Sequence, residues 1–554
     1  MSTPPEEPLE DAIRRVWPAA RARWSSFVLL GDPVVREGLP AVAQIDLGTR
    51  VVSVDGPTME RLGLRGRLEA ILAHEVGHHV RYPGTLATQA RLRLLERSLI
   101  PFEEYSLLNT FTDLLINERL GAELSEDLAA VYRAFTEDLH WKTDPSFLFY
   151  LTVYEELWRL PPGALLGPHT EAFHRAYPAH RADAQLLAQD LFALGPNLYT
   201  QYLFFASVLV RYLQPLEGAE PKAAGPGRCA TGEPSPEDWA DALTQGASEE
   251  EALERALREG WLSRKDADRL KDRGLEHRIG GLPGTRDRDL VQVTRVMASY
   301  YRQQAERLLF RPPAQRRMGE AVVPTTTTPW EPGDPVTAID WRATLSLFGP
   351  DLGPATPVLR EQVADPEGLE VSTWQPRMEL YLDTSGSMPN PIFAVNAMTL
   401  AAVVLAVAAV RAGGEVRALV YSVGTTRLWD WNRSEQQLTA FLMHYIGGGT
   451  QFPFEVLDQS VDQCRDRQPI RVAITDRDFD ANIDAKPACA DIFARAAATP
   501  PGLVMLLHRP LEERVARYRK AGAGVVPVEN LTDFPRMAAR LAEALFPAGG
   551  RACR

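Results

Sequence analysis

The pattern of apolar and polar positions divides the 554-residue chain into regions with different expected folds. Within residues 1–215, apolar and polar residues alternate at 42–55, VAQIDLGTRVVSVD, which is typical of strands. Apolar residues then recur at helical spacing, starting with MERLGLRGRLEAILAHEVGHHV at 59–80. This pattern predicts a mainly α-helical α+β domain over residues 1–215.

The middle of the chain has the composition of connecting structure. Residues 216–310 open with LEGAEPKAAGPGRCATGEPSPEDW, a run rich in Gly, Pro and Ala that is typical of a linker, and continue with charged helical stretches that predict a connector. Residues 311–376 open with RPPAQRRMGEAVVPTTTTPWEPGDPVTAIDW. Because that run has too many Pro and Thr residues for a helix, it predicts extended segments and turns, and we expect residues 311–376 as a whole to be an extended segment before the C-terminal domain.

Short apolar strands alternate with helical stretches over residues 377–548. The strands are MELYLDTS, EVRALVYSV, IRVAITD and GLVMLLHR, and the helical stretch ARLAEALF closes the region. Continuous apolar strands separated by helices are typical of a parallel sheet that is covered on both faces. The sequence therefore predicts a multidomain protein whose C-terminal part is an α/β doubly wound parallel sheet of Rossmann-like type.

Composition and charge narrow the class of protein. The net charge of -13 argues against a general nucleic-acid binder, which needs a basic face to neutralise phosphates. Cys229, Cys464, Cys489 and Cys553 show no CxxC spacing, so neither a disulfide framework nor a thiolate zinc site is indicated. The N-terminus lacks the features of a secretory signal, and the apolar run at 397–410 is shorter than the roughly 20 residues of a membrane span. We expect a cytoplasmic protein with no membrane span and no nucleic-acid partner.

The stretch HEVGH lies inside the helix expected from residue 59 onward. Residues four apart share one face of a helix, so His74 and His78 can both present an imidazole nitrogen to one Zn²⁺ ion. Glu75 projects beside them, toward a metal-bound water whose pKa zinc lowers to about 7. These three residues predict a zinc hydrolase site in which Glu75 is the general base.

A catalytic zinc needs a third protein ligand, and NTFTDLLINERL at 109–120 offers two carboxylates. Asp113 and Asn117 share one helical face, whereas Glu118 lies about 140° away from Asp113 around the helix. HEVGH followed by DLLIN resembles the bacterial metallopeptidase-like domains of zincin type that precede von Willebrand factor type A domains, over residues 10–130. That resemblance implies Asp113 as the third ligand, with Glu118 as the alternative; a purely structural role for Asp113 stays open.

A second motif, DTSGS, follows the first strand of the C-terminal region. It places Asp383, Ser385 and Ser387 at the carboxyl end of that strand, where sheets of this kind bind ligands, and their hard oxygen atoms suit Mg²⁺ or Mn²⁺. The motif resembles the metal-ion-dependent adhesion site of von Willebrand factor type A domains. The resemblance implies two further ligands on later loops, and the sequence supplies Thr450 in IGGGT and Asp476 in ITD.

Together these motifs leave two functions open. The first is a zinc metallopeptidase whose C-terminal domain binds a protein partner or substrate, because a Glu or Asp of the partner completes the Mg²⁺ shell. The second is a non-catalytic adaptor: WEPGDPVTAIDWRATLSLF at 330–348 resembles a segment of bacterial proteins encoded near MoxR-type AAA+ ATPases, which implies such an ATPase as partner. The glutamate between the two histidines and the presence of three rather than four ligands favour the enzyme. No residue is identified as an oxyanion stabiliser.

Overall fold

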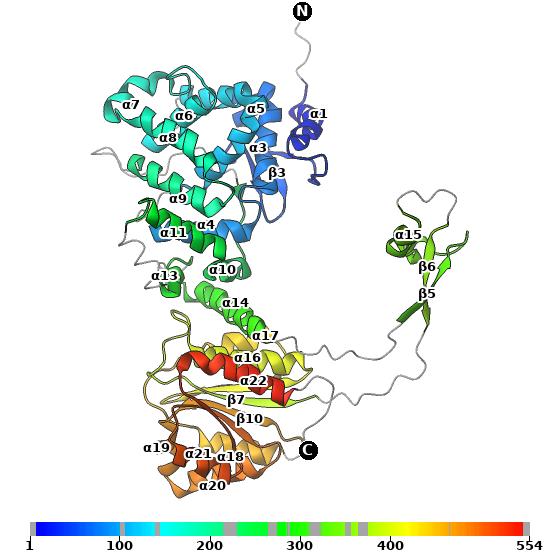
Figure 1. Cartoon of the computed structure of the whole chain (residues 1–554), viewed down its shortest axis with the longest axis vertical. Helices are drawn as coiled ribbons and strands as arrows, with labels where there is room; N and C mark the ends of the chain where they lie inside the picture. The colour runs from blue at the N-terminus through cyan, green and yellow to red at the C-terminus, as the bar shows by residue number, and fades with distance from the viewer. Residues whose placement is uncertain are drawn as a thin grey trace, which may run out of the picture. The chain divides into compact units, whose positions relative to one another are not determined.

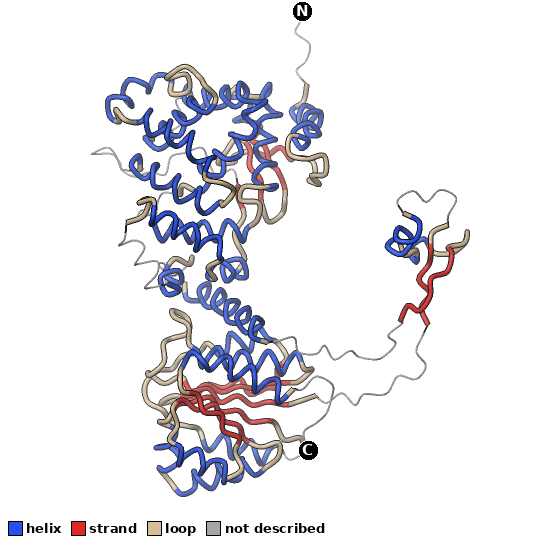
Figure 2. The backbone as a smooth tube through the Cα atoms, in the orientation of Figure 1, coloured by secondary structure: helices blue, strands red, loops and turns tan. Residues whose placement is uncertain are grey.

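The chain forms two compact units, as the multidomain prediction expects (Figures 1 and 2). One unit comprises Met1–Gln303 with Pro389–Val395, and the other comprises Gln304–Met388 with Asn396–Arg554. They are seen in a computed structural model that describes residues 7–99, 106–138, 144–213, 230–263, 274–283, 285, 289–309, 323–349, 356–363, 375–464 and 466–546.

The N-terminal unit consists mainly of helices packed around a small sheet (Figure 1). Its helices are α1 (Leu9–Ala22), α2 (Gly56–Arg61), α3 (Leu68–Val80), α4 (Leu86–Leu99), α5 (Leu108–Glu137), α6 (Pro145–Leu157), α7 (Thr170–Ala176), α8 (His180–Ala193), α9 (Leu198–Leu209), α10 (Pro236–Leu243), α11 (Ala247–Arg258), α13 (Gly274–Gly280) and most of α14 (Leu290–Leu308), whose residues after Gln303 belong to the other unit. Its strands, in order across the sheet, are β1 (Val34–Arg36), β3 (Val51–Asp55), β2 (Ala43–Asp46) and β4 (Ala230–Thr231).

The region expected to connect the two domains is largely part of this first unit. Helix α10 packs on α4, and α11 packs on α9, so the described residues between 230 and 303 add to the N-terminal helical layer. Residues 216–229 of the expected linker, including Cys229, lie outside the described residues, as does Cys553.

The alternating stretch at 42–55 forms the antiparallel hairpin of β2 and β3. Its register pairs Ala43 with Val54 and Asp46 with Val51. The Asp46 carboxylate accepts a hydrogen bond from the backbone N–H of Thr49 at 2.7 Å, which stabilises the turn. Helix α3 packs on β2, so the hairpin lies directly beside the HEVGH segment.

Helix α3 is buried on most of its circumference, because ten of its 13 residues are buried. Gly77 lets its neighbours approach closely, because a Cβ at this position would lie 2.5 Å from Trp24 Cζ2 and 2.9 Å from Ile116 Cγ2. Trp24 also donates a hydrogen bond to the carbonyl oxygen of Ala73 at 2.7 Å. Polar side chains in such a helix are costly to bury without partners, so their presence calls for a functional explanation.

Helix α5 changes direction partway along its length. Leu124 has φ −121° and ψ 17°, outside the helical range, which divides the 30 residues into two helical halves. The break lets both halves contribute to one cavity: Asp113 and Asn117 line it from the first half, and Val131 and Phe135 line it from the second.

The C-terminal unit contains a six-stranded sheet with helices on both faces (Figure 1). Its strands, in order across the sheet, are β12 (Gly524–Val528), β11 (Leu503–His508), β10 (Ile470–Asp476), β7 (Arg377–Asp383), β8 (Glu415–Tyr421) and β9 (Thr425–Asn432). One face carries α16 (Ala397–Arg411), α17 (Glu435–Leu442) and α22 (Phe534–Leu545). The other face carries α18 (Phe454–Gln463), α19 (Phe479–Asp484), α20 (Pro487–Ala498) and α21 (Glu512–Lys520).

This layered arrangement is the doubly wound α/β fold expected from the sequence, with one difference. Neighbouring strands from β12 to β8 are parallel, but β9 pairs with β8 in antiparallel fashion through a short hairpin. The apolar run at 397–410 is the buried helix α16. Among the described residues, no helix combines the length and apolar character that a membrane span requires.

The segment expected to be extended, 311–376, is more structured than the sequence predicted. It contains an antiparallel pair, β5 (Val323–Pro329) and β6 (Val358–Val363), and the helix α15 (Trp341–Phe348). The helix is a correction to the prediction of strands and turns alone, and its start has a local cause: the Asp340 side chain accepts a hydrogen bond from the Ala343 N–H at 2.9 Å, as an N-cap does. Residues 311–322, 350–355 and 364–374 lie outside the described residues.

A buried ion network crosses the central strands of the C-terminal sheet. Glu379 on β7 pairs in register with Arg417 on β8 and Arg471 on β10. The Glu379 carboxylate accepts hydrogen bonds from Arg417 Nε at 2.8 Å, from Tyr381 at 2.9 Å and from Ser460 at 2.7 Å. Arg471 and Glu379 are both fully buried. One carboxylate thus holds two guanidinium groups inside the sheet.

Candidate metal centres

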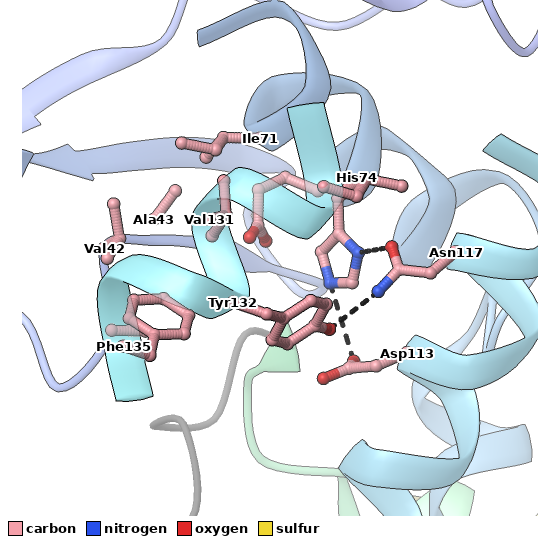
Figure 3. Close-up of a pocket in the computed structure, with 12 residues that line it drawn as sticks. Val42, Ala43, Ile71, His74, Asp113, Asn117, Val131, Tyr132 and Phe135 are labelled. Atoms are coloured by element: carbon pink, nitrogen blue, oxygen red, sulfur yellow. Dashed lines mark hydrogen bonds and ion pairs between the residues drawn. The ribbon is translucent and has the colours of Figure 1, made fainter. Parts of the chain in front are cut away.

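Three predicted zinc ligands come together in the N-terminal unit, and Figure 3 shows two of them, His74 and Asp113. His74 and His78 lie on α3, and Asp113 lies on the first half of α5. Asp113 Oδ1 is 3.5 Å from His74 Nε2 and 3.2 Å from His78 Nε2. Their potential ligand atoms all lie within 4.8 Å of one another, and all three residues are buried.

Neighbouring groups fix the orientation of each of these side chains. His74 Nδ1 is 2.7 Å from Asn117 Oδ1, and His78 Nδ1 is 2.8 Å from the carbonyl oxygen of Tyr82, so both Nδ1 atoms act as donors. In the neutral imidazoles that bind a metal, the lone pair would then lie on Nε2. Asn109 Nδ2 donates to Asp113 Oδ2 at 2.9 Å, which leaves Oδ1 to face the histidines. This is the arrangement of hydrogen bonds that orients metal ligands.

The donor atoms fit a zinc ion. His78 Nε2 and Asp113 Oδ1 are buried, and neither makes a hydrogen bond of acceptable geometry within the part of the chain that the structure describes. Buried polar atoms are rarely left in this state, because each costs roughly 1–3 kcal/mol. Two imidazole nitrogens and one carboxylate oxygen are also a common protein ligand set of catalytic zinc.

The charges of the site are strongly coupled. Burial lowers the pKa of His74, but the Asp113 carboxylate, whose Oδ1 lies 3.5 Å from His74 Nε2, outweighs burial and raises the pKa to about 9. Burial lowers the pKa of His78. Burial raises the pKa of Asp113, yet the two imidazoles outweigh this effect and lower it. Asp113 is therefore held as a carboxylate, which is the form that binds a cation.

Glu75 lines the same cavity as His74 and Asp113. Its side chain is 2% exposed, and its Oε2 atom is buried without a hydrogen-bond partner among the described residues. Burial raises the pKa of Glu75 to about 8, while the charge of His74 lowers it. The empty volume of the cavity, its mouth included, is about 540 Å³.

The structure separates the two candidate third ligands. Glu118 is exposed and does not belong to the group of convergent ligand atoms, whereas Asp113 is 2% exposed and faces both histidines. This follows from helical geometry, because the face of α5 that carries Asp113 and Asn117 packs on α3 and the face that carries Glu118 points to solvent.

The second predicted site lies at the carboxyl ends of β7 and β10, which are neighbours in the sheet. Asp383 is the last residue of β7, and Asp476 is the last residue of β10. Ser385 Oγ is 3.1 Å from Ser387 Oγ, and Ser387 Oγ donates to Asp476 Oδ2 at 3.2 Å. Thr475 Oγ1 donates to Asp383 Oδ2 at 2.7 Å, which orients that carboxylate. The backbone N–H of Ser385 donates to Asp383 Oδ1 at 2.9 Å, so four of the five predicted residues form one connected cluster.

Thr450 comes from a separate loop between α17 and α18. The backbone N–H of Gly386 donates to the carbonyl oxygen of Gly448 at 2.7 Å, which holds this loop against the loop that follows β7. Asn482 Nδ2 donates to the Thr450 carbonyl oxygen at 2.9 Å. The Thr450 hydroxyl itself is buried and has no hydrogen-bond partner within the described ranges.

These atoms fit a small hard cation better than zinc. The site offers carboxylate and hydroxyl oxygens, the ligand types that Mg²⁺ and Mn²⁺ prefer. Burial raises the pKa of Asp383 to about 6, although hydrogen bonds from Thr475 and the Ser385 backbone lower it. A cation bound here would give the buried Asp383 carboxylate and the Thr450 hydroxyl a charged partner.

Sequence reasoning did not identify three residues that shape these sites. Asn109 lies four residues before Asp113, so its helical spacing could have indicated it. Thr475 directly precedes Asp476, but its contact with Asp383 depends on the pairing of strands. Tyr132 accepts a hydrogen bond from Asn117 at 2.8 Å and lines the cavity, and no local pattern predicted this because it depends on the break in α5.

Comparisons with known proteins add little to this description. No family model and no curated protein matches the chain. A solved structure described as von Willebrand factor type A from Catenulispora acidiphila matches at 13% identity, covering 30% of this chain and 42% of that chain, with a TM-score of 0.24. A TM-score of this size does not establish a common fold.

Proposed function

We propose that the N-terminal unit is a zinc-dependent metallopeptidase. His74, His78 and Asp113 would hold the zinc ion, and Glu75 would act as general base. The observation that carries the proposal is the convergence of three oriented ligand atoms, two of them buried without hydrogen bonds, beside a carboxylate that lines the same cavity. A structural zinc site would be expected to use four protein ligands.

The chemistry of the chain's own residues follows from this geometry. Bound zinc would supply Lewis acidity, which makes water a nucleophile near neutral pH. Glu75 Oε2 has no hydrogen-bond partner among the described residues, and as a carboxylate it would accept a proton from a water molecule whose oxygen attacks the peptide carbonyl carbon. The same carboxyl group can then return the proton to the amine that leaves when the C–N bond breaks. Asn117 and Asn109 keep His74 and Asp113 in the orientation that the metal requires.

We further propose that the C-terminal unit is a von Willebrand factor type A domain that binds Mg²⁺ or Mn²⁺. Asp383, Ser385, Ser387, Thr450 and Asp476 would surround the ion. Such a site leaves a coordination position for a carboxylate, so a protein partner or substrate that offers a Glu or Asp would bind through the metal. A MoxR-type AAA+ ATPase in the cytoplasm is the partner class that the segment at 330–348 implies.

One observation favours a second function for the N-terminal site. The side chains of His74, Glu75, His78 and Asp113 are each at most 8% exposed, a degree of burial that suits a metal with a structural role. In that case the chain would act as a non-catalytic adaptor that recruits proteins to an AAA+ ATPase. The cavity next to Glu75 argues for the enzyme instead, because a structural metal does not need one.

One experiment distinguishes the peptidase from the non-catalytic adaptor. Full-length protein loaded with zinc is incubated with a proteome-derived peptide library, and new termini are identified by mass spectrometry. We expect cleavage by the wild type, loss of cleavage in Glu75→Gln with zinc content unchanged, and full cleavage in Glu118→Gln, the matched control on an exposed carboxylate. Cleavage by Glu75→Gln at the wild-type rate would contradict the mechanism, and bound zinc without any cleavage would favour the adaptor.

The C-terminal proposal has its own test. Binding of a purified AAA+ ATPase, or of proteins captured from lysate, is compared in Mg²⁺ and in EDTA. We expect Asp383→Ala to abolish the Mg²⁺-dependent binding and Asp478→Ala, which removes an exposed acid two residues beyond Asp476, to preserve it. Equal binding with and without Mg²⁺ contradicts the proposal.

A further inference from the structure

The cavity beside the zinc ligands has two chemically different sides (Figure 3). Polar side chains that line it are His74, Glu75, Asp113, Asn117 and Tyr132. Apolar side chains also line it, and we call Val42, Ala43, Ile71, Leu128, Val131 and Phe135 the apolar wall. Each of these six residues is at most 8% exposed.

The apolar wall is assembled from three separate elements. Val42 directly precedes β2, Ala43 is the first residue of β2, and Ile71 lies one turn before His74 on α3. Val131 and Phe135 lie on the second half of α5, which the break at Leu124 directs over the cavity. In Figure 3 Val42, Ala43 and Phe135 lie on the side of the cavity away from Asp113. A ligand that reaches the metal would therefore have the apolar wall beside it.

We propose that the apolar wall is a specificity pocket for an aliphatic or aromatic side chain of the residue next to the scissile bond. The proposal rests on the proposed peptidase function and names its substrate class. An apolar side chain gains free energy on leaving water for such a surface, whereas a charged one would lose its hydration without a partner. Every side chain on the apolar wall is a hydrocarbon, so a charged residue would find no compensation on that side.

The affinities of carboxylates of increasing chain length test whether the apolar wall binds a ligand, independently of catalysis. Full-length protein is loaded with Co²⁺, and the affinities of acetate, butyrate and hexanoate are measured from the visible spectrum of the ion. Each methylene buried against the wall is expected to raise affinity about fourfold. Val131→Asp should abolish the rise of affinity with chain length. Val131→Ala should reduce that rise without placing a charge in the core. Val291→Asp, at a position 64% exposed on α14, is the matched control and should leave the series unchanged.

Cleavage supplies the second measurement. Wild-type cleavage sites in the peptide library should have Leu, Ile, Met or Phe enriched at least about tenfold over Asp and Lys on one side of the bond, as expected for burial of a whole side chain.

The outcomes separate this inference from the proposed function. If affinity rises steeply with carboxylate chain length but no proteolysis is found, the peptidase proposal is overturned and the apolar wall is supported as a binding pocket. If proteolysis is found but affinity does not change with chain length, or apolar residues are not enriched at the cleavage sites, the pocket proposal is overturned and the peptidase proposal is not. Failure of Co²⁺ to bind, or equal effects of the Val131 variants and Val291→Asp, overturns the pocket as well.

Discussion

Replacing Asp113 by Asn tests which carboxylate completes the zinc site. The change keeps the size of the side chain and removes its charge. Asp113 Oδ1 faces His74 Nε2 at 3.5 Å and His78 Nε2 at 3.2 Å, whereas Glu118 is exposed on the other side of the helix. Glu118→Gln makes the same chemical change five residues further along α5 and is the matched control. We expect only Asp113→Asn to impair zinc binding.

The magnitude follows from linkage between binding and folding. At a free zinc concentration of 100 times Kd, binding stabilises the folded state by about 2.7 kcal/mol. The entropy of unfolding is about 2.1 cal/mol/K per residue, so for a unit that extends from Met1 to Gln303 this corresponds to a rise in Tm of about 4 °C. If the amide weakens binding about 100-fold, the same zinc concentration equals Kd, the gain falls to about 0.4 kcal/mol, and the rise falls below about 1 °C.

The assay is thermal unfolding of each full-length variant with and without zinc, followed by calorimetry so that the two units can be resolved. Wild type and Glu118→Gln should show the full zinc-dependent rise, and Asp113→Asn should show almost none. A full rise in Asp113→Asn together with a lost rise in Glu118→Gln would identify Glu118 as the ligand and refute the reasoning from the geometry.

Three further predictions follow from contacts of single residues. Asn117→Ala removes the hydrogen bond that orients His74 and should weaken zinc binding about 10- to 100-fold in chelator competition; unchanged affinity contradicts the positioning role. Glu379→Gln leaves two buried arginines uncompensated and should lower the free energy of unfolding of the C-terminal unit in urea by about 3–5 kcal/mol. Glu415→Gln, which removes the charge of a partly exposed ion pair, should lower it by less than about 1 kcal/mol, and equal effects of the two variants argue against the network. Gly448→Ala places a Cβ 2.9 Å from a valine methyl at φ +95° and should weaken Mg²⁺ binding in calorimetric titration, while Gly424→Ala, with open space around it, should not.

The sequence by itself determined the features that depend on local spacing. Four-residue spacing places His74 and His78 on one face of a helix, and apolar alternation defines the hairpin at 42–55. The order of apolar strands and helices after residue 377 predicts a doubly wound sheet, and the ends of its strands locate Asp383 and Asp476. Each of these patterns is fixed within a few residues by backbone geometry.

Tertiary structure alone decided how these elements meet. Helical spacing shows that Asp113 and Glu118 lie on different faces of α5, but which face is buried depends on packing against α3, a helix that begins 40 residues earlier in the sequence. The break at Leu124 lets Tyr132 and the α5 part of the apolar wall line the cavity, and the hydrogen bond from Gly386 to Gly448 holds the Thr450 loop beside the DTSGS loop. Contacts of this kind depend on the shape and packing of whole elements, which is why no local pattern in the sequence specifies them.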